Sequence, residues 1–145
     1  MHTHPYSIRY WPTWMAIAVL WCLSHLPFTW QLAIGRFIGR TFQKFAARRR
    51  AIAAVNLSLC LPELPASERE KILAEQFISM GFGVLEMAMS WWAPARRLKK
   101  LAHVEGLQHL QAALDRGKGV ILLSAHVTTL EMGGRLLALH APFHV

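Results

Sequence analysis

The sequence predicts an α/β protein in which an N-terminal membrane-associated helix and amphipathic helices precede the start of a βαβα sheet. Three observations support this fold class: an apolar N-terminal stretch, helical periodicity in the middle of the chain, and short apolar runs after residue 100. The 145 residues, 54% hydrophobic and 17% charged, are one domain's worth of sequence. We expect a membrane anchor helix at 1–35, a helical basic segment at 36–100 and an incomplete α/β core at 101–145.

Positive charge is concentrated in the first part of the chain. Residues 1–62 contain seven bases and no acid, whereas residues 63–145 contain nine bases and eight acids. Such an asymmetry suits anionic phospholipid surfaces or nucleic acid. Because the bases adjoin an apolar run and do not form a soluble platform, we expect membrane lipids as partners and no nucleic acid.

Residues 10–35 are the first candidate for a membrane helix, because these 26 residues include no Asp, Glu, Lys or Arg. About 20 apolar residues are needed to cross a bilayer core. Ser24, His25 and Pro27 interrupt the second half, which leaves three structures open: a kinked spanning helix, a helix that dips into one leaflet, and a buried core helix. Six bases follow the segment and only Arg9 precedes it, so a spanning helix would place the rest of the chain in the cytoplasm.

A basic amphipathic helix is predicted next, because basic residues recur at a spacing of four and would form one stripe. These residues are Arg36, Arg40, Lys44 and Arg48, followed directly by Arg49 and Arg50. The stripe is either the solvated face of an ordinary helix or a surface that binds anionic lipid or a phosphorylated glycolipid. The preceding apolar segment favours the lipid-binding surface.

Residues 67–92 predict a second long helix. Ser67-Glu68-Arg69-Glu70 has the form of a capping box, apolar residues recur at helical spacing, and Pro94 supplies a stop. Glu86 lies among these apolar residues, either as a surface carboxylate or as the partner of a buried cation.

We expect neither a disulfide nor a metal site. Cys22 lies in the apolar stretch and Cys60 beside Leu61, so both are predicted to be small buried apolar residues. No cluster has metal-ligand spacing, and Gly117-Lys118-Gly119 is too short for a phosphate-binding loop.

After residue 100 the pattern changes to that of a βαβ unit. We predict a strand at 101–105, a helix at 107–114, a turn at 115–119, a fully buried strand at 120–123 and a further helix from about 129 to 139. The 13-residue crossover at 106–118 is long enough for a parallel connection.

The candidate catalytic residues follow the predicted buried strand. His126 would lie at its carboxyl end, where ligands collect in open α/β sheets, and Glu131 in the first turn of the next helix. A carboxylate that accepts the Nδ1 proton would fix the imidazole tautomer and leave Nε2 free as a base. The alternative is structural, because Thr128-Thr129-Leu130-Glu131 also has the form of a capping box.

The segment at 117–126, GKGVILLSAH, with EMGGR at 131–135, resembles the catalytic block of the lipid A biosynthesis (lauroyl/myristoyl) acyltransferases. Upstream blocks also resemble that family in order and spacing: His4-Pro5, Tyr10-Trp11-Pro12-Thr13-Trp14, Arg48-Arg49-Arg50, residues 56–63, Met80-Gly81 through Glu86, and Trp91-Trp92. The resemblance covers essentially the whole chain. It implies a membrane-associated helical start followed by an α/β acyltransferase domain of the lysophospholipid-acyltransferase-like superfamily.

The resemblance also implies a reaction. His126 would be the general base that deprotonates a hydroxyl of a lipid A precursor, and that oxygen would attack the thioester carbonyl of an acylated acyl carrier protein. Glu131 would orient and charge-balance His126, and no cofactor would be needed beyond the acyl carrier protein as co-substrate. The phosphorylated glycolipid would be held by the basic segment, and the enzyme would lie at the bacterial inner membrane with its catalytic part on the cytoplasmic side.

Two other functions stay open: a glycerolipid (lysophospholipid) acyltransferase that uses the same pair, and a noncatalytic membrane-binding fragment in which His126 is structural. A nucleophilic role for Ser124 is a further alternative. Members of the family are about twice as long as this chain. We therefore expect an N-terminal fragment that is inactive and poorly soluble alone, since an interrupted parallel sheet exposes a hydrophobic edge.

Overall fold

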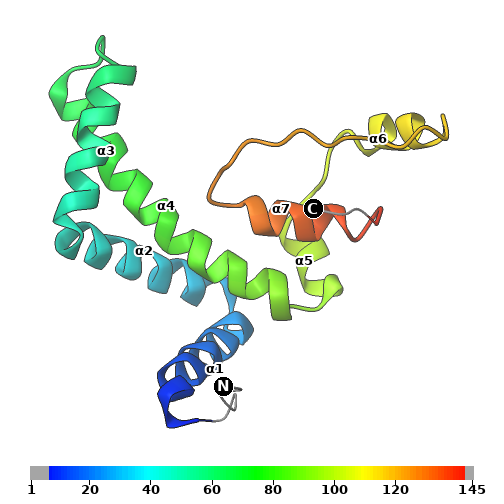
Figure 1. Ribbon diagram of the computed structural model, residues 1–145, viewed down its shortest axis with the longest axis horizontal. Coiled ribbons are helices and arrows are strands. Elements are labelled where there is room, and N and C mark those ends of the chain that lie inside the picture. Colours follow the sequence, from blue (N-terminus) through cyan, green and yellow to red (C-terminus); the bar gives the residue numbers. More distant parts are fainter. Residues whose placement is uncertain (1–6, 143–145) are drawn as a thin grey trace.

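The computed structural model describes residues 7–142, which form one short 3-10 turn and a set of α-helices around one long central helix. The elements are the turn Ile8–Tyr10, α1 Trp11–His25, α2 Phe28–Phe45, α3 Ala47–Cys60, α4 Ala66–Trp92, α5 Ala95–Leu101, α6 Leu107–Leu114 and α7 Leu130–Leu137. Helices α1, α2, α3 and α7 all pack against α4 (Figure 1).

The main packing is between α2 and α4, and it follows from a four-residue repeat in both helices. The buried residues of α4 include Leu73, Phe77, Gly81, Leu85 and Met89. Those of α2 are Gln31, Gly35 and Gly39. Residues four apart lie along one side of a helix, so each helix presents a single continuous stripe to the other.

Glycines in these stripes bring the two backbones into contact. A Cβ built on Gly81 would lie 2.7 Å from the backbone nitrogen of Gly39 and would collide with the carbonyl of Gly35. Small residues permit helices to approach this closely. Beside the contact the rings of Phe42 and Phe77 pack with their centroids 5.5 Å apart. The body of the protein is therefore a tight α2–α4 pair.

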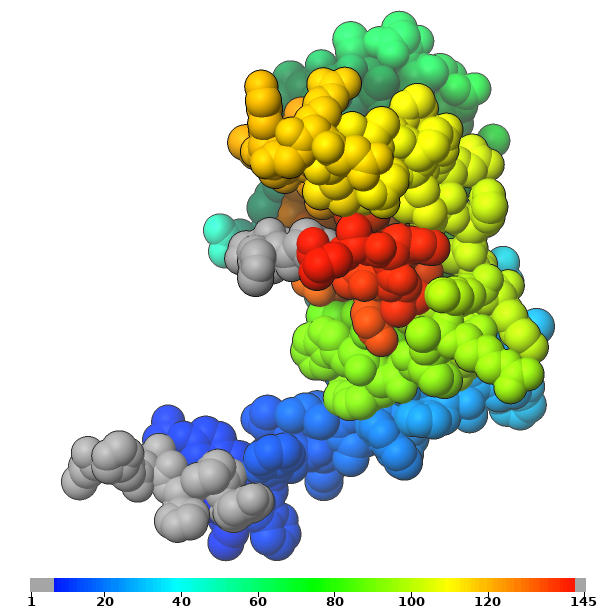
Figure 2. Space-filling view, turned by 90° about the vertical axis from the view of Figure 1, so that its right-hand side faces the viewer, coloured from blue at the N-terminus to red at the C-terminus, as the bar shows by residue number. Residues whose placement is uncertain are grey.

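The apolar segment at 10–35 is divided between α1 and α2 at Pro27, because proline disfavours helical conformation in the residue before it. Figures 1 and 2 show α1 extending away from the rest of the molecule. Ser24 is its one buried residue. Trp11 is 61% exposed and Trp21 50% exposed. An apolar helix therefore stands outside the protein core.

Side chains from two other helices hold the end of α1. The last carbonyls of a helix have no partner within it. The Gln31 amide donates to the carbonyl oxygens of Leu23 (2.8 Å) and Ser24 (3.1 Å). The Arg97 guanidinium donates to the carbonyl oxygen of Ser24 (2.6 Å) and to that of Leu26. These bonds join α1 to α2 and α5.

The basic segment also forms two helices, where one was predicted. Helix α2 ends at Phe45, and Ala46 has φ −90° and ψ 54°, outside the helical region. Arg36, Arg40 and Lys44 lie on α2, whereas Arg48, Arg49 and Arg50 lie in the first turn of α3. All six are exposed. The stripe is thus interrupted after Lys44.

The prediction of an α/β fold is wrong for the residues that the structure describes, since no strand occurs between residues 7 and 142. Leu101 ends α5, and residues 102–106 are irregular. In the predicted buried strand, Ile121 is 96% and Leu123 is 99% exposed. A strand needs backbone hydrogen bonds to a neighbour, and within the described residues no such bond joins 120–123 to another segment. The apolar composition of 120–123 did not indicate whether a neighbouring strand was present.

The later helices agree with the periodicity. The helix predicted at 107–114 is α6, that at 67–92 is α4, and that at about 129 to 139 is the shorter α7. In the predicted turn, Gly117 and Gly119 have φ of 67° and 75°, which glycine adopts without strain.

Two local predictions are wrong. Helix α4 begins at Ala66 with Pro65 as N-cap and no side-chain cap hydrogen bond, so Ser67 does not form a capping box. Cys22 and Cys60 are exposed free cysteines. Cys22 is on α1, which projects from the body, and Cys60 is the last residue of α3, so neither faces the core.

Candidate functional site

His126 lies in the segment that connects α6 to α7. The amide of Val127 donates to the carbonyl of Ala125 at 3.1 Å and closes a three-residue turn with His126 at its centre. The amide of Leu130 then donates to the carbonyl of Val127 at 3.1 Å, where α7 begins. The His126 side chain is exposed, so this turn presents the imidazole to solvent.

Glu131 lies in the first turn of α7, as the sequence predicted, and is also exposed. Within residues 7–142 no hydrogen bond or ion pair joins its side chain to His126. The N-cap residue is Thr129, which makes no side-chain cap bond, so the capping-box alternative is not seen either. The structure places the two residues on either side of one helix start, and their catalytic pairing stays a prediction.

Helix α7 is fixed by an apolar cluster. Met89, Ala93 and Leu98 are buried, and Met132, Leu136 and Leu139 pack against them. Burial of a side chain of this size contributes about 1.5–3 kcal/mol. The cluster therefore holds the helix that carries Glu131 against α4 and α5.

The turn with His126 has its own contact with α4. Ser79 Oγ lies 3.2 Å from Thr128 Oγ1. A Cβ built on Gly83, one turn further along α4, would lie 3.1 Å from the carbonyl oxygen of Thr128. Short-range sequence patterns do not indicate this contact, because it joins residues 49 positions apart. The one local sign is a glycine in the middle of a helix, where it is unfavourable unless something packs closely.

Glu86 fits neither of its two predicted roles. It lines a small cavity of about 10 Å³ between α2 and α4, together with Gln31 and Phe82. Glu86 Oε2 and Gln31 Oε1 are buried, and neither has a hydrogen-bond partner among the described residues. Burial raises the pKa of the Glu86 carboxyl above its ordinary value of 4.5. This environment therefore favours the neutral carboxyl more than water does.

Replacing Glu86 by Gln should remove a pH dependence of stability. A carboxyl whose folded-state pKa is raised contributes stability that is complete below its unfolded pKa and is lost as pH rises through the folded value. The free energy of unfolding of the wild type should therefore fall, relative to Glu86→Gln, as pH rises above about 4.5. Thermal melts of both proteins in detergent from pH 4 to about 8 measure the difference.

Glu75→Gln is the matched control for this experiment, because Glu75 is an exposed glutamate on the same helix. Its melting curve should keep the pH dependence of the wild type. Parallel wild-type and Glu86→Gln curves across the whole range would contradict the prediction.

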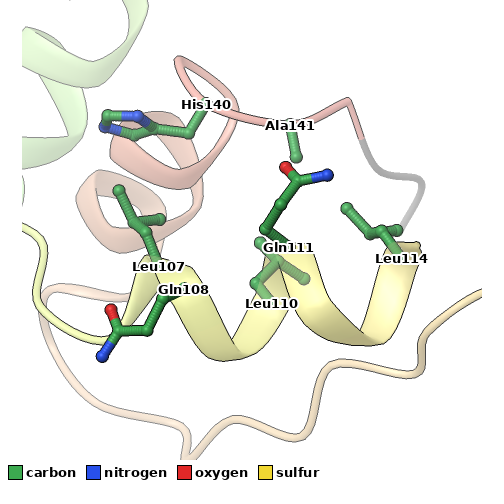
Figure 3. Close-up of a pocket in the computed structure, with 7 residues that line it drawn as sticks. All are labelled: Leu107, Gln108, Leu110, Gln111, Leu114, His140 and Ala141. Atoms are coloured by element: carbon green, nitrogen blue, oxygen red, sulfur yellow. The ribbon is translucent and has the colours of Figure 1, made fainter. Parts of the chain in front are cut away.

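An open pocket of about 260 Å³ lies between α6 and the residues after α7 (Figure 3). Leu107 and Leu114 extend from α6 toward the side on which His140 and Ala141 lie, and Leu110 also lines the pocket. The described residues that line the pocket include no acid to orient His140 and none of the predicted site residues. The candidate site is therefore the turn with His126 and not this pocket.

Comparison with known proteins identifies the family. The chain matches the family described as bacterial lipid A biosynthesis acyltransferase over residues 2–144. It is 41% identical to the lipid A biosynthesis palmitoleoyltransferase of Escherichia coli K12 and 36% identical to the lauroyltransferase of that organism, each over 139 residues. Both alignments cover 96% of this chain and 44% of the relative.

A lipid A biosynthesis acyltransferase of Haemophilus influenzae is 38% identical over 141 residues, which are 96% of this chain and 45% of that protein. No solved structure matches the chain significantly. The chain thus spans less than half the length of these relatives. The match nevertheless extends from residue 2 to residue 144 and confirms the resemblance seen in the sequence motifs. This chain belongs to the bacterial lipid A biosynthesis acyltransferases.

Proposed function

We propose that the protein transfers a fatty acyl chain from acyl carrier protein to a hydroxyl of a lipid A precursor, with His126 as general base. The observation that carries this proposal is the exposed turn centred on His126, directly before the helix with Glu131, in a chain of this family. An exposed imidazole at a helix start is accessible to two large substrates at once.

In this proposal, His126 accepts and returns the proton that the reaction transfers. Nε2 of His126 takes the proton of the acceptor hydroxyl, and the oxygen attacks the thioester carbonyl carbon. The carbon–sulfur bond then breaks, and the leaving thiolate of the carrier protein takes the proton back from the imidazolium. Glu131 orients the ring and stabilises its charged form once the two side chains meet in the substrate complex.

We further propose that α1 lies in the cytoplasmic leaflet of the inner membrane. Apolar side chains are exposed around α1, and its 15 residues make a rod of about 22 Å, shorter than a bilayer core of about 30 Å. Within residues 7–142, α4 is the one helix long and apolar enough for a span. Other helices pack against α4, and 33% of its apolar window is buried in the protein.

The test uses full-length protein with acylated acyl carrier protein and either a tetraacylated lipid A precursor or a lysophospholipid. Acylation of the lipid A precursor is the expected result. Acylation of the lysophospholipid alone would instead assign the glycerolipid reaction. If neither lipid gains an acyl chain, the noncatalytic membrane-binding function is supported.

The basic side chains of α2 should contribute to membrane binding. Replacing Arg36, Arg40 and Lys44 by Gln removes three exposed charges from α2. Each base near an anionic surface contributes about 1 kcal/mol, so binding to phosphatidylglycerol-containing vesicles should weaken on the order of 100-fold at low salt. Vesicle sedimentation measures the affinity.

The control replaces three exposed bases of α5 by Gln: Arg96, Lys99 and Lys100. This variant has the same net charge as the α2 variant. Equal weakening in both would show that net charge, and not the face of α2, determines binding.

A further inference from the structure

We propose that Ser79 and Gly83 of α4 hold Thr128 and thereby position His126 for proton transfer. The inference rests on the proposed role of His126 as the base. Ser79 and Gly83 do not touch the reacting atoms in this proposal, so they are positioning residues.

Thr128 is the point at which a long exposed segment meets the helical body. Every side chain from residue 115 to residue 129 is exposed. Residues 115–129 form hydrogen bonds among themselves and with the adjoining helices α6 and α7. Among the described residues, the bond between Ser79 and Thr128 is the single hydrogen bond that joins them to any other helix. Without it, nothing polar would fix the segment upstream of α7.

The chain between Thr128 and His126 is short and hydrogen-bonded. The bond from Val127 to Ala125 closes the turn around His126, and the bond from Leu130 to Val127 joins that turn to α7. A shift of Thr128 is therefore transmitted to the imidazole two residues away, because few free torsions lie between them. The contact of Thr128 with α4 therefore helps to determine the position of His126.

Gly83 lets the backbone of Thr128 lie against α4. An added Cβ would be 3.1 Å from the Thr128 carbonyl oxygen and 3.4 Å from its Cβ. The hydroxyl contact at Ser79 and the backbone contact at Gly83 lie one helical turn apart, so they fix Thr128 at two points. A side chain at position 83 would move Thr128 outward by a few tenths of an ångström.

Two separate sets of contacts thus hold the two predicted catalytic residues. The apolar cluster fixes α7 and with it Glu131. His126 lies outside α7, so its distance from Glu131 depends on how the preceding turn is held. Displacement of a catalytic group by about 1 Å can lower a rate on the order of 100-fold. The Ser79–Thr128 contact therefore controls an interatomic distance that the chemistry needs.

Ser79→Ala in the full-length protein tests the hydrogen bond. We expect kcat for acylation of the lipid A precursor to fall about tenfold with KM unchanged, because loss of position affects the chemical step. Ser79→Thr keeps the hydroxyl and should restore the rate. Ser90→Ala is the matched control, because Ser90 is on the same helix and its hydroxyl bonds only to the carbonyl of Met87 in that helix.

Gly83→Ala tests the backbone contact with an independent readout. Alanine favours a helix over glycine, so the melting temperature should stay the same or rise while kcat falls about tenfold. A merely structural role would instead lower rate and melting temperature together.

His126→Ala separates failure of this inference from failure of the proposed function. If His126→Ala retains wild-type activity, His126 is not the base and the proposed function fails. If His126→Ala is inactive while Ser79→Ala and Gly83→Ala have wild-type kcat, the positioning role is overturned and the base assignment stands. A fall in kcat for Ser90→Ala equal to that for Ser79→Ala would also overturn it.

Discussion

Replacing His126 by Ala should lower kcat of the full-length protein by about 10²–10⁴-fold, because general-base assistance contributes rate factors of that size. KM for the lipid acceptor should change little, since the imidazole acts on one proton and not on the bulk of the lipid. Acyl transfer to a lipid A precursor at saturating carrier protein measures both constants. Thr128→Ala should have a milder effect, because it alters the position of the base and not its chemistry.

The matched control is His109→Ala, which removes an exposed imidazole from α6. It should leave kcat unchanged. The kcat of Glu131→Gln should lie between those of His126→Ala and His109→Ala, because the His126 ring keeps its basic nitrogen but loses the carboxylate that stabilises its charged form. A wild-type kcat for His126→Ala would show that His126 is not the general base.

Gly81→Ala should have the largest effect on stability. The added methyl would collide with the Gly35 carbonyl and lie 2.7 Å from the Gly39 nitrogen, and these are backbone atoms that no side-chain rotation can move away. Overpacking of a tight core costs about 1–3 kcal/mol, and we expect the upper end of that range because two helix backbones must separate. Thermal unfolding in detergent should show a lowered melting temperature.

Gly133→Ala is the control for this substitution, because a Cβ on Gly133 in α7 would meet nothing within 4 Å. Its melting temperature should stay the same or rise through the higher helix propensity of alanine. Equal stability of Gly81→Ala and wild type would contradict the close backbone contact between α2 and α4.

Local sequence patterns predicted the elements whose causes are local. Apolar spacing and Pro94 predicted α4, and the 107–114 periodicity predicted α6 with the bounds observed. The interruption at Ala46 has no such cause, because neither proline nor glycine marks it. The predicted sheet failed for a different reason. The apolar run at 120–123 is typical of a strand, but a strand also needs a second strand, which short-range patterns do not reveal.

For the candidate site too, features with a local sequence signal were predicted and contacts between distant residues were not. His126 and Glu131 were predicted from a spacing of five residues and from family resemblance; His126 lies in the turn before α7 and Glu131 in its first turn. The contact of Thr128 with Ser79 joins residues 49 positions apart and leaves no periodic trace in the sequence. The bond of Arg97 to the end of α1 spans 73 positions and was equally invisible. Long-range polar contacts of single residues are therefore what the sequence could not predict.

Arg97 and its neighbour Leu98 link α1 to α7 through α5. Arg97 donates hydrogen bonds to carbonyl oxygens at the end of α1, and Leu98 belongs to the apolar cluster against which α7 packs. With α1 in lipid as proposed, these two adjacent residues would set the height of α7, and with it Glu131, above the bilayer surface. In the proposed reaction, an acceptor hydroxyl in the headgroup layer would then reach Glu131 and the neighbouring turn at a fixed height, which lengthening α5 by one residue would change.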